Sequence, residues 1–215
     1  MTCQLYLITP PRFNIETFQH SLDQALQSND IACVQLRLKG DGGNPAPQDQ
    51  VRKAAKILMP LVQQRDVAFI INDDAELAQE LGADGVHVGQ TDTSVKDARA
   101  IVGATAIVGA TCHDSRHLAF DAAENGADYV AFGAFYPTTT KATEFHPEPG
   151  LLEVWSSTTN VPCVAIGGIT KDNAGPLIKA GADFIAVVSA VWEHPQGPAH
   201  AVQEFKALVD KPTKI

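Results

Sequence analysis

The sequence has few cysteines, few aromatic residues, no long apolar run and a shortage of positive charge. Its 215 residues include 4 Cys and 7% aromatic residues, and 16 Lys+Arg stand against 25 Asp+Glu, for a net charge of −9. This balance gives no overall attraction to nucleic acid or to an anionic membrane, and we expect neither as a partner. Any phosphate-bearing ligand would therefore need a local cluster of cations.

Segments that direct a chain to or across a membrane are also missing from the sequence. No apolar run approaches the ~20 residues of a membrane span, and Met1 to Gln4 lack the basic and then apolar layout of a signal peptide. The cysteines, at positions 3, 33, 112 and 163, form no close pair and show no metal-type spacing. They are typical of buried free thiols in a reducing compartment, so we expect a cytoplasmic protein.

A Gly-Ala-Asp repeat organises much of the chain. It begins at Gly82, Gly126 and Gly181, and an apolar, strand-like segment follows each copy. A helix-like stretch precedes each copy, over residues 74–81, 115–125 and 171–180. Because glycine readily takes the left-handed conformation that ends a helix, each copy predicts a helix, a cap, a short loop and a strand.

Short continuous apolar runs predict eight strands, as in a parallel sheet that is buried on both faces. The predicted strands cover residues 4–8, 31–36, 67–71, 85–88, 106–108, 129–132, 162–166 and 184–187. With about 27 residues for each strand–helix unit, a closed (β/α)8 TIM barrel is the economical interpretation, and a doubly wound open sheet is the alternative. No linker marks a second domain, so we expect one barrel over residues 1–215. The polar stretches 40–50 and 137–150 are predicted as loops over its mouth.

In such barrels the chemistry lies at the carboxyl ends of the strands. Gln35, Arg37 and Lys39 are three long donors at alternate positions, from the last residues of the second predicted strand onward. The period of two in extended chain places all three on one face, toward one ligand. The alternative is that these residues form a solvated basic edge without a ligand. We favour the ligand, because placing alternate charged side chains at the end of a buried strand costs free energy unless they have a function.

Acidic residues follow the next two strands. Asn72, Asp73 and Asp74 come directly after the third strand, and Asp92 follows the fourth. One of the first three is expected to cap the following helix. Asp73 and Asp92 would face one cavity and repel each other unless a cation lies between them. Two carboxylates together with waters and substrate phosphates suit Mg²⁺.

Hydroxyl groups follow the fifth and sixth strands. Thr111 offers one hydroxyl, whereas His113 is expected to be a structural or surface residue. His87, inside the fourth strand, is expected to be a satisfied core histidine. Thr138, Thr139, Thr140 and Lys141 are three hydroxyls and a cation in a row, which suits an anion.

Glycine and serine follow the last two strands. The pair Gly167-Gly168 lets backbone N–H groups approach a ligand closely, and Val188-Ser189 precede a helix N-terminus after the eighth strand. The loops after strands 7 and 8 are the recurrent phosphate site of these barrels.

These segments together resemble the thiamine-phosphate synthase family, in the family's order from about residue 5 to 191. The matching segments are 35–39, 72–73, 82–92, 137–141, 167–169 and 188–190. The resemblance implies a (β/α)8 barrel. It also implies a transferase that joins 4-amino-2-methyl-5-(diphosphooxymethyl)pyrimidine to a thiazole phosphate and releases thiamine phosphate and pyrophosphate, with Mg²⁺.

The resemblance also implies roles for individual residues. The pyrimidine diphosphate is assigned Gln35, Leu36, Arg37, Leu38, Lys39, Asn72, Thr111 and Lys141. Among these, the catalytic residues are Arg37, Lys39, Lys141 and Thr111. The Mg²⁺ ligands are Asp73 and Asp92, and the thiazole phosphate is assigned Thr138, Thr139, Thr140, Gly168, Val188 and Ser189.

Two positions depart from the family pattern, and two other functions compete. Thr111 stands where the family usually has Ser, and Ala134 replaces a usual Pro; neither change removes a chemical group.

The paralogous thiazole tautomerase shares the barrel but lacks the metal carboxylates and the basic run present here. A non-catalytic sensor of thiamine phosphate would bind the product without turnover. The sequence leaves open whether the chain forms a homo-oligomer.

Overall fold

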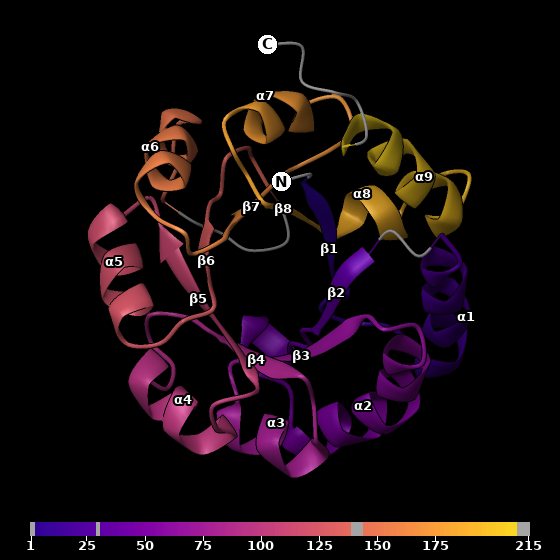
Figure 1. Cartoon of the computed structure of the whole chain (residues 1–215). Coiled ribbons are helices and arrows are strands. Elements are labelled where there is room, and N and C mark those ends of the chain that lie inside the picture. The colour runs from indigo at the N-terminus through magenta and orange to yellow at the C-terminus, as the bar shows by residue number, and fades with distance from the viewer. Residues whose placement is uncertain (1–2, 29–30, 139–143, 210–215) are drawn as a thin grey trace.

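The computed structural model describes residues 3–28, 31–138 and 144–209, and it contains a closed barrel of eight parallel strands (Figure 1). Each strand pairs with its neighbour in the chain, and β1 pairs with β8 to close the ring. The strands are β1 (Gln4–Ile8), β2 (Ile31–Leu36), β3 (Ala68–Asn72), β4 (Gly85–Val88), β5 (Ile107–His113), β6 (Tyr129–Phe132), β7 (Cys163–Ile166) and β8 (Phe184–Val187). The predicted (β/α)8 barrel is confirmed, and the open sheet is wrong.

Helices surround the strands as an outer ring (Figure 1). They are α1 (Ile15–Leu26), α2 (Gln48–Gln63), α3 (Ala75–Leu81), α4 (Val95–Val102), α5 (Arg116–Glu124), α6 (Gly150–Thr158), α7 (Ala174–Lys179), α8 (Ser189–Trp192) and α9 (Pro198–Val209), with a 3₁₀ turn at Asp41–Gly43. The larger apolar core lies between the strands and the helices, and a smaller one lies inside the barrel. Strand β5 is longer than the sequence predicted, so Thr111 lies within it rather than after it.

The Gly-Ala-Asp repeat has a structural explanation at the amino ends of the strands. The repeat glycines have positive φ angles of 69°, 99° and 98°, as expected for residues that end helices. Asp84 accepts the N–H of Phe69 at 2.7 Å. The carboxylates of Asp128 and Asp183 accept the N–H groups of Val108 at 2.7 Å and of Cys163 at 2.8 Å. Each aspartate thus fixes the start of the strand that precedes its own.

The cysteines are buried free thiols, as predicted. Burial raises the pKa of Cys3, Cys112 and Cys163 to about 12. Such thiols are inert packing groups rather than nucleophiles. None of the helices in the described part of the chain is long and apolar enough to cross a membrane.

Candidate active site

The basic run after β2 alternates between the barrel mouth and the outer core. Gln35 Nε2 donates to Asn72 Oδ1 at 2.6 Å, and Lys39 Nζ forms an ion pair with Asp73 at 2.8 Å. The side chain of Leu36 is buried in the outer core, and Leu38 packs against that core. The period of two therefore turns both leucine side chains away from the mouth, and only their backbone could meet the pyrimidine diphosphate.

Arg37 is a half-buried cation whose hydrogen-bonding capacity is not filled. Its Nη1 atom is buried and has no hydrogen-bond partner among residues 3–28, 31–138 and 144–209. Burial lowers the pKa of the Arg37 guanidinium, and the negative charge of Asp73 partly opposes this effect. The backbone is held in place by Thr9, whose Oγ1 accepts the N–H of Arg37 at 3.0 Å. A buried guanidinium nitrogen without a partner is costly, and an anionic ligand would complete its hydrogen bonds.

Two carboxylates lie together at the ends of β3 and β4. Asp74 is the residue that caps α3, with its carboxylate accepting the Leu77 N–H at 2.9 Å, which leaves Asp73 for the site. Asp92 accepts the N–H of Gly89 at 2.8 Å. Burial raises the pKa of the Asp92 carboxyl; the Gly89 N–H lowers it, and the negative charge of Asp73 raises it further. The carboxylates thus lie close enough to repel each other, which is the environment that a divalent cation relieves.

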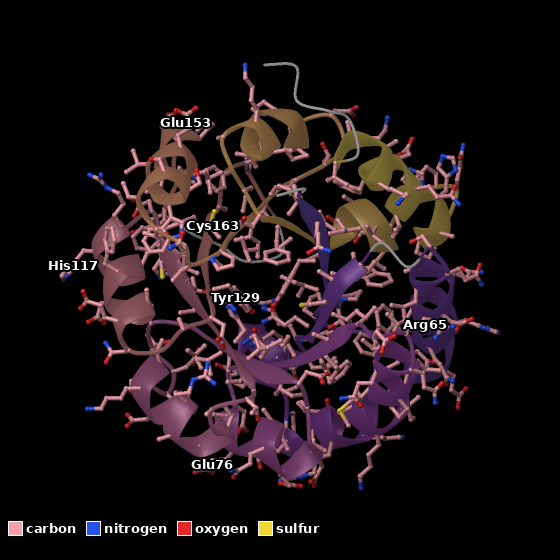
Figure 2. All side chains as sticks on the ribbon, in the orientation of Figure 1. Arg65, Glu76, His117, Tyr129, Glu153 and Cys163 are labelled. Carbon is pink, nitrogen blue, oxygen red and sulfur yellow. The ribbon has the colours of Figure 1, made fainter. Side chains whose placement is uncertain are left out.

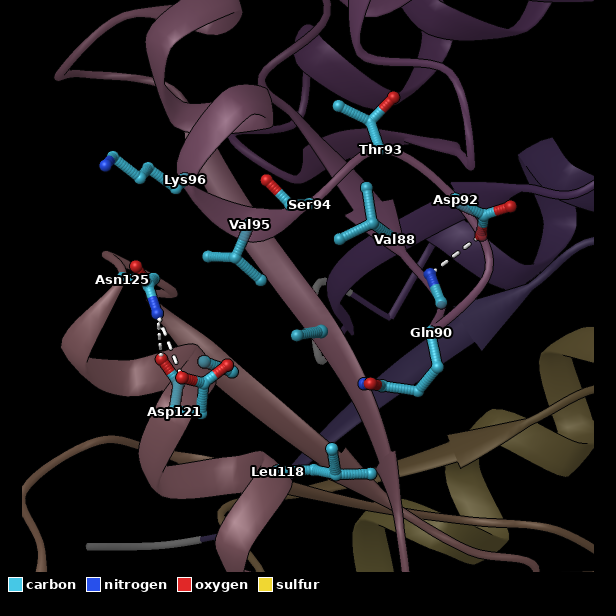
Figure 3. A pocket seen from close by; sticks show the side chains of 13 residues that line it. Val88, Gln90, Asp92, Thr93, Ser94, Val95, Lys96, Leu118, Asp121 and Asn125 are labelled. Carbon is cyan, nitrogen blue, oxygen red and sulfur yellow. Dashed lines mark hydrogen bonds between the residues drawn. The ribbon is translucent and has the colours of Figure 1, made fainter.

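A cavity of about 300 Å³ adjoins Asp92 on the outer side of the barrel, between the β4–α4 loop and α5 (Figure 3). Its lining includes Gln90, Lys96, Asp121 and Asn125. Gln90 Nε2 crosses to β5 and donates to the carbonyl oxygen of Thr111 at 2.6 Å. The loop that carries Asp92 is therefore attached to the strand that carries Thr111.

Polar side chains inside the barrel form one connected hydrogen-bond network that the sequence did not predict. Tyr6 Oη lies 3.1 Å from Gln35 Oε1 and 2.8 Å from Tyr129 Oη. His87 lies between Tyr129 Oη, 2.9 Å from its Nδ1, and Thr111 Oγ1, 2.8 Å from its Nε2. Figure 2 shows Tyr129 near the centre of the ring of strands. The network connects Asn72 and Gln35 on one side of the mouth with Thr111 on the other.

The network depends on a glycine in β5. A Cβ at Gly109 would lie only 2.0 Å from the ring of Tyr129, so no larger residue leaves room for that ring. His87 is a satisfied core histidine, as predicted, but it also contacts a candidate substrate ligand. One sequence signal could have indicated the network. Tyr6, His87 and Tyr129 each place a ring with a polar atom within a largely apolar strand, in β1, β4 and β6.

The loop after β6 is held against the end of β5. The ring of His113 stacks on Phe145 with a centroid distance of 4.2 Å, and the N–H of Ala134 donates to the carbonyl oxygen of Phe145 at 3.1 Å. Ala134 is buried, at the position where the family usually has Pro. Thr138 belongs to this loop, whereas the predicted ligands Thr139, Thr140 and Lys141 lie outside the described residues.

The ends of β7 and β8 form the opposite side of the mouth. Gly168 has a φ of +62°, and a Cβ there would lie 2.3 Å from the carbonyl oxygen of Pro137. This glycine is therefore required by the neighbouring β6 loop, in addition to any approach of a ligand. Asn173 holds the turn by donating from Nδ2 to the Gly168 carbonyl oxygen at 3.0 Å. Val188 is half-buried, and the exposed Ser189 begins the one-turn helix α8.

Comparisons with known proteins agree with this geometry. Residues 5–191 match the family model described as thiamine monophosphate synthase. The chain is 56% identical to the thiamine-phosphate synthase of Rhodospirillum centenum, over 96% of this chain and 98% of that one. It is 53% identical to that of Hyphomonas neptunium, over 96% and 94%. A solved thiamine phosphate pyrophosphorylase from Pyrococcus furiosus superimposes with a TM-score of 0.80 at 30% identity, covering 97% and 96% of the two chains. The chain therefore belongs to the thiamine-phosphate synthase family of transferases.

Proposed function

We propose that the barrel mouth joins 4-amino-2-methyl-5-(diphosphooxymethyl)pyrimidine to 4-methyl-5-(2-phosphooxyethyl)thiazole, giving thiamine phosphate and pyrophosphate. The observation that carries this proposal is the half-buried guanidinium of Arg37, whose buried Nη1 lacks a partner in the described part of the chain. It lies near Asp73, which pairs with Lys39 and is close to Asp92. A cation with an unfilled N–H group, near a pair of carboxylates, suits a diphosphate that arrives with a divalent metal.

The chemistry follows from the charges that develop in the reaction. The bond between the pyrimidine methylene and the diphosphate oxygen breaks, and its electron pair leaves with pyrophosphate. The thiazole nitrogen forms the new bond to the methylene carbon, so no protein nucleophile is needed. Arg37 and Lys39, with Lys141 as the family resemblance implies, meet the negative charge that grows on the leaving group. Binding also holds the two substrates in line and excludes water.

Asp73 and Asp92 are the residues that would hold Mg²⁺, and their mutual repulsion fits that role. Bound there, the metal supplies a positive charge to the departing diphosphate. Lys39 bonds to Asp73 at 2.8 Å and thereby places one further cation beside the same group. Gln35, Asn72 and Thr111 surround the position proposed for the pyrimidine.

The thiazole phosphate is assigned to the other side of the mouth. Thr138, Gly168, Val188 and Ser189 are the proposed ligands within the described residues, and the family resemblance adds Thr139 and Thr140. Neutral donors suit a monophosphate whose charge does not change in the reaction. This division separates a charged half, where bond breaking occurs, from a neutral half that positions the nucleophile.

The test is to mix the two phosphorylated precursors with Mg²⁺ and to measure thiamine phosphate and pyrophosphate. Formation of both products in equal amounts supports the proposal. A sensor would bind thiamine phosphate without turnover, and a tautomerase would isomerise the thiazole without consuming the pyrimidine; either result would contradict it. A cytoplasmic location stays a prediction.

A further inference from the structure

We infer that the hydrogen bonds inside the barrel run in one direction, so that Thr111 presents a lone pair and Asn72 presents an N–H to the substrate. Tyr6, Tyr129 and His87 would then be positioning residues that select an aminopyrimidine over the corresponding oxopyrimidine. This inference rests on the proposed function, because it concerns how the same site recognises the pyrimidine.

The direction begins at Gln35. Its Nε2 donates to Asn72 Oδ1 at 2.6 Å, which leaves its Oε1 as the acceptor for the Tyr6 hydroxyl at 3.1 Å. A tyrosine hydroxyl carries one proton, and Tyr6 gives that proton to Gln35. The 2.8 Å contact between Tyr6 and Tyr129 must then be donated by Tyr129.

The direction continues through His87. Since the single proton of Tyr129 points to Tyr6, Tyr129 Oη can only accept from His87, so the proton of His87 lies on Nδ1. His87 is 8% exposed, and a hydroxyl oxygen lies within 2.9 Å of each of its ring nitrogens. Because burial disfavours the charged imidazolium, we infer a neutral ring that carries one proton. Its Nε2 therefore accepts the proton of Thr111 Oγ1 across 2.8 Å.

The direction of the network fixes which hydrogen-bonding groups its two end residues, Thr111 and Asn72, can offer to a ligand. Thr111 has given its proton to His87, so only acceptor lone pairs of its hydroxyl remain for a ligand. Asn72 has used Oδ1 to accept from Gln35, so it offers the hydrogens of Nδ2. An acceptor and a donor complement the exocyclic amino group and a ring nitrogen of an aminopyrimidine. An oxo group in place of the amino group would place a lone pair against a lone pair at Thr111.

If the hydrogen bonds of the network ran in the opposite direction, Thr111 and Asn72 would offer the opposite groups to the substrate. If both amides were turned over, Tyr6 would donate to Tyr129, Tyr129 would donate to His87 Nδ1, and His87 Nε2–H would donate to Thr111. Thr111 would then donate to the substrate, and Asn72 would present an oxygen. The position of one proton on His87 therefore distinguishes the two arrangements.

The direct test is nuclear magnetic resonance on the full chain labelled with ¹⁵N-histidine, without substrate. The His87→Gln variant identifies the His87 signals by their loss. We expect a neutral ring with its proton on Nδ1. A proton on Nε2, or on both nitrogens, would overturn the inference. Because this readout needs no turnover, it decides the inference even if the proposed reaction is wrong.

A second test measures the preference between the aminopyrimidine diphosphate and its oxo analogue. The wild type is expected to prefer the amino compound by about 100-fold or more in kcat/KM. In Tyr129→Phe, His87 loses the acceptor that holds its proton on Nδ1, so the preference should fall about tenfold or more. Tyr136→Phe is the matched control, since Tyr136 donates its hydroxyl to the carbonyl oxygen of Asn173 at 2.7 Å, outside the network. An unchanged preference in Tyr129→Phe, with the control also unchanged, would contradict the inference.

Discussion

The two ends of the barrel use charged side chains in opposite ways. At the amino ends of the strands, the carboxylates of Asp84, Asp128 and Asp183 accept backbone N–H groups at 2.7, 2.7 and 2.8 Å. At the carboxyl ends, Asp92 lies beside another carboxylate, and Arg37 has a buried nitrogen that no described residue satisfies. A satisfied carboxylate stabilises the fold, whereas crowded or unpaired charges cost stability until a ligand compensates them.

The interior of the barrel shows the same contrast. A cavity of about 330 Å³ opens at the amino ends, and its lining includes Cys33, Ile70 and Val164. Tyr6 and Tyr129 also line this cavity, and their hydroxyls take part in the network that leads to the other end. The two tyrosine hydroxyls thus mark a boundary inside the barrel. The proposed substrate-binding side chains lie between these hydroxyls and the carboxyl ends of the strands.

The largest expected effect is at the carboxylate pair. Chelation of divalent metal should abolish turnover, and Asp92→Asn should lower kcat/KM by about 1000-fold, since metal stabilisation of a leaving group is worth several kcal/mol. The melting temperature of Asp92→Asn should stay equal or rise, because the repulsion from Asp73 is removed. Steady-state kinetics and thermal unfolding check both statements.

The control for this prediction is Asp121→Asn, which removes an acidic side chain from the cavity beside Asp92 without touching the proposed metal ligands. It should retain wild-type kinetics. Full activity of the wild type in excess chelator would remove the metal from the mechanism.

The next effect concerns Arg37. Arg37→Met should lower kcat about 100-fold and change KM less, because the charge that Arg37 meets grows in the transition state. Its melting temperature should not fall, since the variant replaces a half-buried, partly unsatisfied cation with an apolar side chain of similar length. Arg52→Met, which removes the cation that pairs with Glu80 on the helical surface, is the control. A change in KM alone would mean that Arg37 binds the substrate in the ground state. A large loss of stability would contradict the statement that the charges at the carboxyl ends of the strands do not stabilise the fold.

A smaller effect is expected at the amino end, and on stability alone. Asp183→Ala leaves the buried N–H of Cys163 without its acceptor and should cost about 1–3 kcal/mol of unfolding free energy. Asp183→Asn keeps an acceptor oxygen and should cost less. Urea unfolding measures both, and kcat/KM should remain within about twofold of the wild-type value, because the proposed substrate ligands lie at the opposite end of the barrel. A large kinetic defect in a folded variant would show that the amino end participates in catalysis.

The features that the sequence predicted correctly depend on neighbours in the chain. Apolar runs mark the strands, and the repeat glycines mark helix ends. The cap at Asp74 is also local, since its partner Leu77 is three residues away. The network was not predicted because it requires the barrel to close. Tyr6 and Tyr129 are 123 positions apart in the chain, and only the ring of eight strands brings their hydroxyls together.

Gly168 shows a second limit of sequence reasoning. The sequence gives a reason for glycine there, namely a close approach of ligand to backbone. The structure adds another, because the carbonyl oxygen of Pro137 occupies the space that a Cβ would need. Which neighbour excludes a side chain depends on how two loops pack, and no local pattern encodes that. The extension of β5 to His113, which places Thr111 inside the strand, was also missed.

The smallest expected effect is at Ser189, and it tests the division of the mouth into two halves. Ser189→Ala should weaken binding of the thiazole phosphate about fivefold, the value of one neutral hydrogen bond at an exposed position. The pyrimidine diphosphate should bind as before, since its proposed ligands lie in or after β2, β3 and β5, together with Lys141 after β6, and none of them follows β8. Substitution of Gly168 would be a poorer test, because a side chain there would displace the β6 loop as well. Ser157→Ala, on the outer helix α6, is the matched control. Calorimetric titration of each ligand separately, with a non-reacting pyrimidine analogue, measures the two affinities. Equal loss of both ligands in a folded Ser189→Ala protein would mean that the two substrates share one site.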